Sequence, residues 1–130
     1  MADNWINAIE RARRHSPFLT LGLDRQPDLE KLLLQGRGED ALAWARGCGE
    51  GAPDIETELR YEKWGMATAL AIGDLAGGFT LARVMEELSG LADRALDAAI
   101  ADAILARTPD AEPAGFVALA LGKHGAGELN

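Results

Sequence analysis

The residues best suited to chemistry form a glycine-rich turn at positions 122–127, with the sequence Gly-Lys-His-Gly-Ala-Gly. The turn follows an apolar run at 116–121, so the pattern predicts a strand, a turn and then a helix. Such a turn can point backbone N–H groups at an anion. It is neither a Walker A loop, which ends in Gly-Lys-Ser/Thr, nor the dinucleotide fingerprint, because its glycines run G-x-x-G-x-G. An ordinary glycine turn is the alternative.

No other residue is a strong candidate for chemistry. His15 is expected at a helix end, and His124 adjoins the turn without an identifiable partner acid. Cys48 has no neighbouring His or Cys, so we expect a surface thiol. Two further groups are expected to have structural roles. Solvated helix faces are expected to carry Glu86, Glu87, Asp93 and Asp97. The core or the helix interfaces are expected to be anchored by Trp5, Trp44 and Trp64. We predict no catalytic residue and no metal ligand in these 130 residues.

Composition predicts one cytoplasmic domain that is mainly α-helical. The 130 residues are 48% hydrophobic and 26% charged, with only 5% aromatic residues. The net charge of −8 argues against a surface that neutralises nucleic-acid phosphates. A single cysteine cannot form an internal disulfide, which favours a reducing compartment. No basic-then-apolar leader and no apolar run near 18 residues is present, so we expect no membrane segment.

Six helices must position the turn. A first helix capped by Asp3 is expected to end near residue 15, and Ser16-Pro17 begins a second that ends near 26. Two short helices follow at 27–34 and 39–47. The fifth, capped by Asp54, runs to about 76, and the sixth, capped by Thr80, covers 81–107. Gly65 and Gly73 each cost the fifth helix about 1 kcal/mol, so packing must compensate.

The sixth helix has the clearest pattern. We expect its apolar stripe to be buried, with small alanines that let neighbouring helices approach closely: Leu81, Met85, Leu88, Ala92, Ala95, Ala99 and Ala103. The opposite, polar stripe holds Arg83, Glu87, Gly90, Arg94 and Asp97.

The expected fold is therefore mainly α, with a helical body at 1–107 and a carboxy-terminal piece at 108–130 that contains a linker, one β-strand and the glycine turn. The strand at 116–121 has no partner in the sequence. Unpaired strand edges are templates for association. We expect this segment to be disordered, folded irregularly onto helices, or paired between chains through self-association.

A family resemblance adds a function. Leu119-Ala-Leu-Gly-Lys-His-Gly-Ala-Gly-Glu-Leu-Asn130 resembles the Gly-Lys-Leu-Gly-Gly-x-Glu-Leu segment of glutamine synthetase adenylyltransferases, also called glutamate–ammonia ligase adenylyltransferase/adenylyl-removing enzymes. The segments Val84-Met-Glu-Glu-Leu-Ser-Gly-Leu-Ala-Asp93, Ser16-Pro-Phe-Leu and Gln26-Pro-Asp-Leu are also similar to that family. The resemblance covers nearly the whole chain.

The resemblance implies a truncated piece of a nucleotidyltransferase-like α/β domain from a long cytoplasmic enzyme with two such halves. One half adenylylates a tyrosine of glutamine synthetase, and the amino-terminal half removes the AMP by phosphorolysis. A PII signalling protein and glutamine set the balance, and the parent enzyme uses ATP and Mg²⁺. Met1 and the Ser-Pro segment favour the front of the amino-terminal half, although the two halves resemble each other.

The resemblance also assigns a site. Gly122, Lys123, Gly125 and Ala126 would flank the nucleotide, and Glu128 would start the following helix. His124 stands where leucine is common, and a methyl group at Ala126 would hinder approach to a phosphate. The family places Ser-Asp-x-Asp just after this turn to hold magnesium. Because Asp-x-Asp does not occur in these residues, we expect an inactive fragment without a bound cofactor; the alternative is a non-catalytic helical protein-interaction module.

Overall fold

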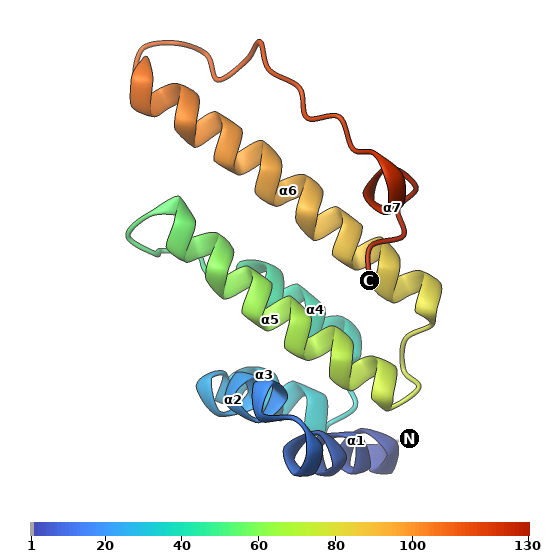
Figure 1. The fold of residues 1–130 in the computed structure, drawn as a ribbon. Helices are drawn as coiled ribbons and strands as arrows, with labels where there is room; N and C mark the ends of the chain where they lie inside the picture. The colour runs from blue at the N-terminus through green and yellow to red at the C-terminus, as the bar shows by residue number, and fades with distance from the viewer. Residues whose placement is uncertain (1) are drawn as a thin grey trace.

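The computed structural model describes residues 2–130, which form seven α-helices and no β-strand. The helices are α1 (Ala2–His15), α2 (Pro17–Arg25), α3 (Pro27–Leu34), α4 (Gly38–Gly47), α5 (Ile55–Leu75), α6 (Leu81–Arg107) and α7 (Gly122–Gly125). In Figure 1, α1–α5 form a bundle, the long α6 lies along α5, and the chain then returns beside the other side of α6. None of the helices within residues 2–130 combines the length and apolar character needed to cross a membrane.

The predicted starts of α2, α5 and α6 are confirmed, because local capping sets them. The Ser16 hydroxyl accepts a hydrogen bond from the Leu19 N–H at 3.2 Å, and Thr80 caps α6 through the Arg83 N–H at the same distance. Asp54 accepts the Thr57 N–H at 2.7 Å, and this hydrogen bond lowers the pKa of its carboxyl. The predicted Asp3 cap is wrong: α1 begins at Ala2, so Asp3 lies inside the first turn.

The core lies within α1–α5 and the turn after α5. Its fully buried large side chains come from four helices: Leu23, Leu29, Leu33, Leu42, Met66, Leu70 and Ile72. Trp5 is buried as predicted and meets Phe79 edge to face, with ring centroids 5.9 Å apart. Trp44 and Trp64 are only partly buried.

Close packing explains the two glycines inside α5. A Cβ on Gly73 would lie 2.2 Å from Phe79 Cδ2, and one on Gly65 would lie 3.0 Å from the Ala45 Cβ of α4. The close packing at these two glycines compensates for the cost of placing glycine inside a helix. At the end of α5, Gly77 has a φ of 70°, and its N–H donates to the Asp74 carbonyl while the Gly78 N–H donates to the Gly73 carbonyl. This Schellman motif needs a left-handed residue, which glycine supplies without strain.

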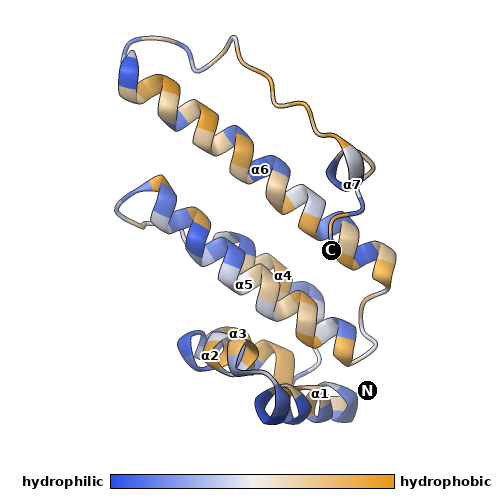
Figure 2. Ribbon diagram, in the orientation of Figure 1, coloured by the Kyte–Doolittle hydropathy of each residue, from blue (hydrophilic) through white to orange (hydrophobic). Residues whose placement is uncertain are grey.

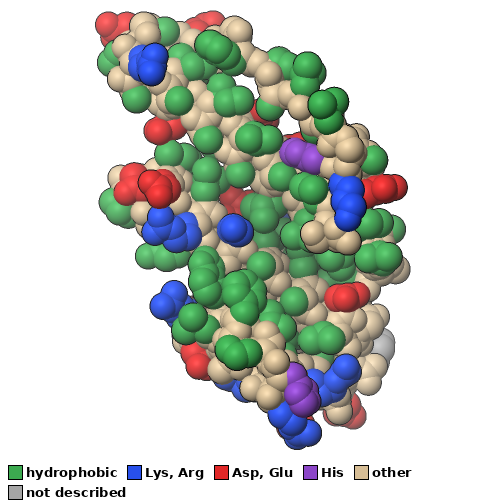
Figure 3. All heavy atoms as spheres, in the orientation of Figure 1, with side chains coloured by type: hydrophobic (Ala, Val, Ile, Leu, Met, Phe, Trp, Pro, Cys, Tyr) green, Lys and Arg blue, Asp and Glu red, His purple; other side chains and the backbone are tan. Residues whose placement is uncertain are grey.

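The expected orientation of α6 is largely wrong. Ser89 is its one buried residue, and no member of the predicted apolar stripe is buried. Leu88 of that stripe does pack against the core, together with Val84 and Leu91. Figure 2 shows hydrophobic residues along α6 and the returning chain, and Figure 3 shows hydrophobic side chains on the surface of this part of the molecule.

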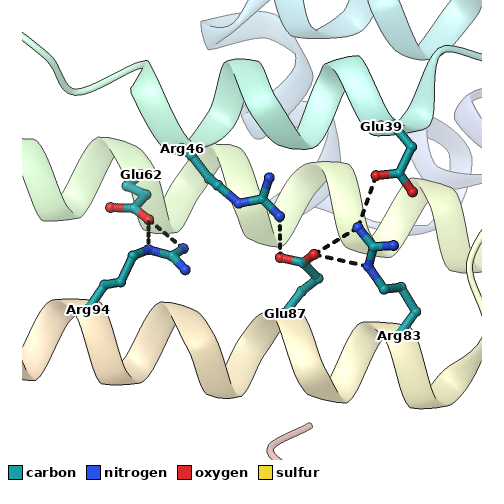
Figure 4. A network of polar contacts seen from close by, with 6 residues as sticks. All are labelled: Glu39, Arg46, Glu62, Arg83, Glu87 and Arg94. Carbon is teal, nitrogen blue, oxygen red and sulfur yellow. Dashed lines mark hydrogen bonds and ion pairs between the residues drawn. The ribbon is translucent and has the colours of Figure 1, made fainter.

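Charged residues of α6 instead face the bundle (Figure 4). Glu87 binds Arg46 of α4 and also Arg83, which in turn binds Glu39 of α4. Burial raises the pKa of Glu87, but the hydrogen bonds and charges of Arg46 and Arg83 outweigh it, so this pKa lies below its ordinary value. The prediction of a solvated face is therefore wrong for Glu87, which is 11% exposed, while Glu86 is exposed as predicted.

A second ion pair joins α6 to α5. Arg94 donates from Nε at 3.1 Å and from Nη2 at 2.7 Å to the same Glu62 carboxylate oxygen. Glu62 is buried, so this arginine satisfies a carboxylate that would otherwise be costly to remove from water. Helix α6 is thus held to the bundle by polar contacts at two levels along its length.

The predicted strand at 116–121 is also wrong. This stretch is extended, but its backbone N–H and C=O groups pair with no other backbone group in residues 2–130. Its large side chains are exposed, from 74% for Phe116 to 86% for Leu121. A strand requires a partner to complete its hydrogen bonds, and the described part of the chain provides none.

Candidate functional site

The glycine turn folds as the single helical turn α7. Gly122 enters it with a φ of 62°, and Gly127 ends it with a φ of 72°. The Glu128 N–H donates to the Lys123 carbonyl at 2.7 Å, and the Gly127 N–H donates to the His124 carbonyl at 3.0 Å. These two bonds form a Schellman motif, so the expected helix starting at Glu128 is replaced by a helix that ends just before it.

Gly125 is required for a different reason. A Cβ at this position would lie 2.5 Å from the Ala120 carbonyl oxygen and 3.1 Å from its carbon. The chain therefore folds back so closely that only glycine fits. This contact joins the extended segment to the turn that follows it.

The structure places all four predicted nucleotide-binding residues, Gly122, Lys123, Gly125 and Ala126, on the exposed surface of this turn. The Lys123 ammonium donates to the Asn130 side-chain oxygen at 3.1 Å. The turn consequently presents one ammonium group and exposed backbone. An arrangement of this kind suits an anion.

The turn is attached to α6 through two side chains of that helix. His124 Nε2 lies 2.7 Å from an Asp93 carboxylate oxygen, and the Leu129 N–H donates to the buried Ser89 hydroxyl at 3.3 Å. An ionised carboxylate only accepts hydrogen bonds, so Nε2 is the donor in this pair. Asp93 is the partner acid that sequence reasoning did not find, and no local signal links two residues 31 positions apart.

The described residues do not fit a magnesium site. Within 2–130, no group of three or more His, Cys, Asp or Glu side chains is arranged to hold a metal ion. Magnesium requires a near-octahedral set of oxygen ligands, and the Asp93 carboxylate that contacts α7 already accepts from His124.

The remaining candidates lie outside the turn. His15 is the exposed last residue of α1, as predicted. Cys48 is partly buried rather than a surface thiol, and its S–H is within hydrogen-bonding distance of the Ala45 and Tyr61 carbonyls, at 3.1 and 3.2 Å. Burial raises the pKa of this thiol, so it stays protonated at neutral pH. Cys48 is thus unsuited to nucleophilic chemistry.

Comparison with known proteins gives one positive result. A family model described as glutamate-ammonia ligase adenylyltransferase matches residues 10–130. No curated protein and no solved structure matches the chain. The match extends from the first helix to the glycine turn and agrees with the resemblance carried by the terminal motif, so the chain belongs to the glutamate-ammonia ligase adenylyltransferase family.

Proposed function

We propose that this chain is the helical lead-in to a nucleotidyltransferase half of an enzyme that adenylylates and deadenylylates glutamine synthetase. The family match over residues 10–130 supports this function. The bundle α1–α5 braces α6, and α6 carries the turn through Asp93 and Ser89. The helices would therefore set the position of the turn relative to the rest of the catalytic domain.

In this proposal, Gly122, Lys123, Gly125 and Ala126 form one wall of the nucleotide site. Support comes from their exposure on one turn and from the Lys123 ammonium, which would attract a phosphate. The parent enzyme would supply the carboxylates for Mg²⁺ and would bind ATP. Residues 1–130 alone would have no transferase activity, because the sequence contains no Asp-x-Asp.

In this proposal, the chain lies at the front of the amino-terminal half of the enzyme. That half is the one that removes AMP from glutamine synthetase. The supporting residues are Ser16-Pro17-Phe18-Leu19, in which Ser16 caps α2 and Pro17 occupies its first turn. A PII protein is the proposed regulatory partner and the cytoplasm the proposed location. Glutamine synthetase is the proposed protein substrate.

The test compares the parent enzyme with two glycine variants. Gly125→Ala drives a methyl group against the Ala120 carbonyl, whereas Gly47→Ala at the end of α4 meets nothing within 4 Å. We expect the parent to release ADP from adenylylated glutamine synthetase in the presence of phosphate and magnesium. Gly125→Ala should slow this release by about tenfold or more, and Gly47→Ala should not change it.

Three results would each contradict a part of the proposal. If Gly125→Ala displaces the turn but the rate of ADP release is unchanged, the turn is not part of the nucleotide site. A parent that adds AMP but never removes it would place the chain in the other half. Release of ADP by residues 1–130 alone would contradict the predicted inactivity of the isolated chain.

A further inference from the structure

A surface pocket on the bundle is not explained by the proposed function. It lies between the α2–α3 junction, α4 and α5, has a volume of about 330 Å³, and shares no residue with α7. Its lining is Arg25, Gln26, Trp44, Cys48, Arg60, Tyr61 and Trp64. This volume is within the range of small-molecule sites, which combine apolar walls with a few polar groups.

The walls of the pocket are aromatic. Trp44 and Trp64 are partly buried, and Tyr61 is 52% exposed. The Trp64 ring is held in place by Phe18, which stacks on it with centroids 5.1 Å apart and an interplanar angle of 20°. Fixed aromatic surfaces of this kind favour a flat, unsaturated ligand.

The pocket also contains an arginine without an acidic partner. The Arg25 guanidinium carbon lies over the Trp64 ring, 5.5 Å from its centroid, and no carboxylate within residues 2–130 is at ion-pair distance from it. Arg11, Arg14 and Arg107 also have no ion pair within residues 2–130, and of these four arginines Arg25 is the one that lines this pocket. Its planar fork of N–H donors matches a carboxylate or a phosphate.

Three other polar side chains of the pocket have their own contacts. Arg60 binds Glu56 through one nitrogen at 2.9 Å, and both side chains are well exposed. The Cys48 thiol contacts two carbonyls, and the Gln26 amide nitrogen donates to the Gly22 carbonyl at 3.0 Å. The Gln26 oxygen is buried without a partner beside Gly65, out of reach of a ligand. Arg25 is therefore the charged group of the pocket left to pair with a ligand, with Arg60 adding positive charge.

We propose that this pocket binds a small aromatic anion, in which a flat ring lies against Trp44 and Trp64 and a carboxylate or phosphate group pairs with Arg25. Both parts are needed. The ring removes apolar aromatic surface from water, and the acid satisfies the guanidinium. An anion without a ring, or a ring without an anion, should bind at least about tenfold more weakly, since each lacks one of the two contributions.

The test is a titration followed by the indole N–H signals in ¹H–¹⁵N NMR spectra of the whole chain. The probes form two matched sets: indole-3-acetate with tryptophol and acetate, and phenyl phosphate with benzyl alcohol and inorganic phosphate. Trp44 and Trp64 should shift with a Kd below about 1 mM for at least one aromatic anion, while Trp5, buried in the core, should not. The proposal is overturned if neither aromatic anion binds about tenfold more tightly than both of its controls.

Variants of Arg25 make the test specific. Arg25→Gln should weaken binding of the aromatic anion by about tenfold or more, and Arg25→Lys should weaken it less because the charge remains but the planar fork is lost. Arg14→Gln is the matched control, since Arg14 is an exposed arginine outside the pocket. An unchanged affinity in Arg25→Gln, with an unchanged Trp5 signal to show that the core is intact, would overturn the assignment.

Discussion

Replacing Glu87 should loosen the attachment of α6 to the bundle. Its carboxylate accepts a hydrogen bond from Arg46 of α4 and one from Arg83 Nε, lies at ion-pair distance from Arg83 Nη2, and its side chain is 11% exposed. Glu87→Gln keeps the shape of the side chain but removes the charge and one acceptor oxygen. The two arginines then remain close to each other without a shared anion.

The size of the effect follows from these contacts. A hydrogen bond to a charged group contributes about 1.5–3 kcal/mol, and a fully buried ion pair costs about 3–5 kcal/mol when one partner is removed. Arg46 and Arg83 are 37% and 35% exposed, so water compensates part of the loss. We therefore expect a destabilisation of about 2 kcal/mol, which corresponds to a fall in Tm of about 8 °C for a chain of this size.

The assay is thermal unfolding monitored by circular dichroism, combined with hydrogen exchange of the α6 amides. Glu86→Gln is the matched control, because Glu86 is the neighbouring residue on the same helix, is exposed, and has no ion pair within residues 2–130. The free energy of unfolding of the control should lie within about 0.5 kcal/mol of that of the unmodified chain. Equal Tm values for the two variants, or unchanged protection of α6 in Glu87→Gln, would refute the argument that Glu87 holds α6 to the bundle.

Three further predictions concern the helices α1–α6. Gly73→Ala should destabilise the chain by about 2–3 kcal/mol in urea unfolding, since the new methyl group meets the Phe79 ring at 2.2 Å, whereas Gly47→Ala should be neutral or slightly stabilising. The Cys48 thiol should react with a disulfide reagent at neutral pH more than about tenfold more slowly than in the denatured chain, because burial raises its pKa and covers it; equal rates would contradict this. The folded pKa of Glu87 is lowered, so its stabilisation is present above the unfolded pKa and is lost as pH falls through the folded value. The Tm difference between Glu87→Gln and the unmodified chain should accordingly shrink in acid, and a difference that stays constant would refute this origin.

Local signals allowed the helices to be predicted from the sequence, and long-range contacts explain the errors. Ser16, Asp54 and Thr80 cap the helices that they were expected to cap, because capping depends on residues only three positions away. The orientation of α6 could not be found in this way. Its own pattern favours charges toward water, but the partners that draw Glu87 and Arg94 inward lie on other helices.

The structure of the carboxy-terminal piece, residues 108–130, also depends on long-range contacts that the local sequence does not indicate. The apolar run at 116–121 has strand-like composition, yet a strand exists only when another segment pairs with it. A glycine-rich turn was correctly predicted at 122–127, since Gly122 and Gly127 are placed where left-handed φ values occur. Its attachment through His124 and Asp93 was not predictable from either residue alone.

The polar attachment of α6 has a thermodynamic consequence. Unfolding that exposes apolar surface raises the heat capacity and gives a large denaturant dependence, because both quantities scale with the surface exposed. Only Ser89 of α6 is buried, and the apolar side chains of α6 that pack against the core, Val84, Leu88 and Leu91, are only partly buried, beside the ion pairs to Arg46 and Glu62. Detachment of α6 would expose comparatively little apolar area, so this step should show a small m-value and a small change in heat capacity. Native-state hydrogen exchange would then detect it as a sub-global opening that urea barely promotes, well separated from the cooperative unfolding of α1–α5.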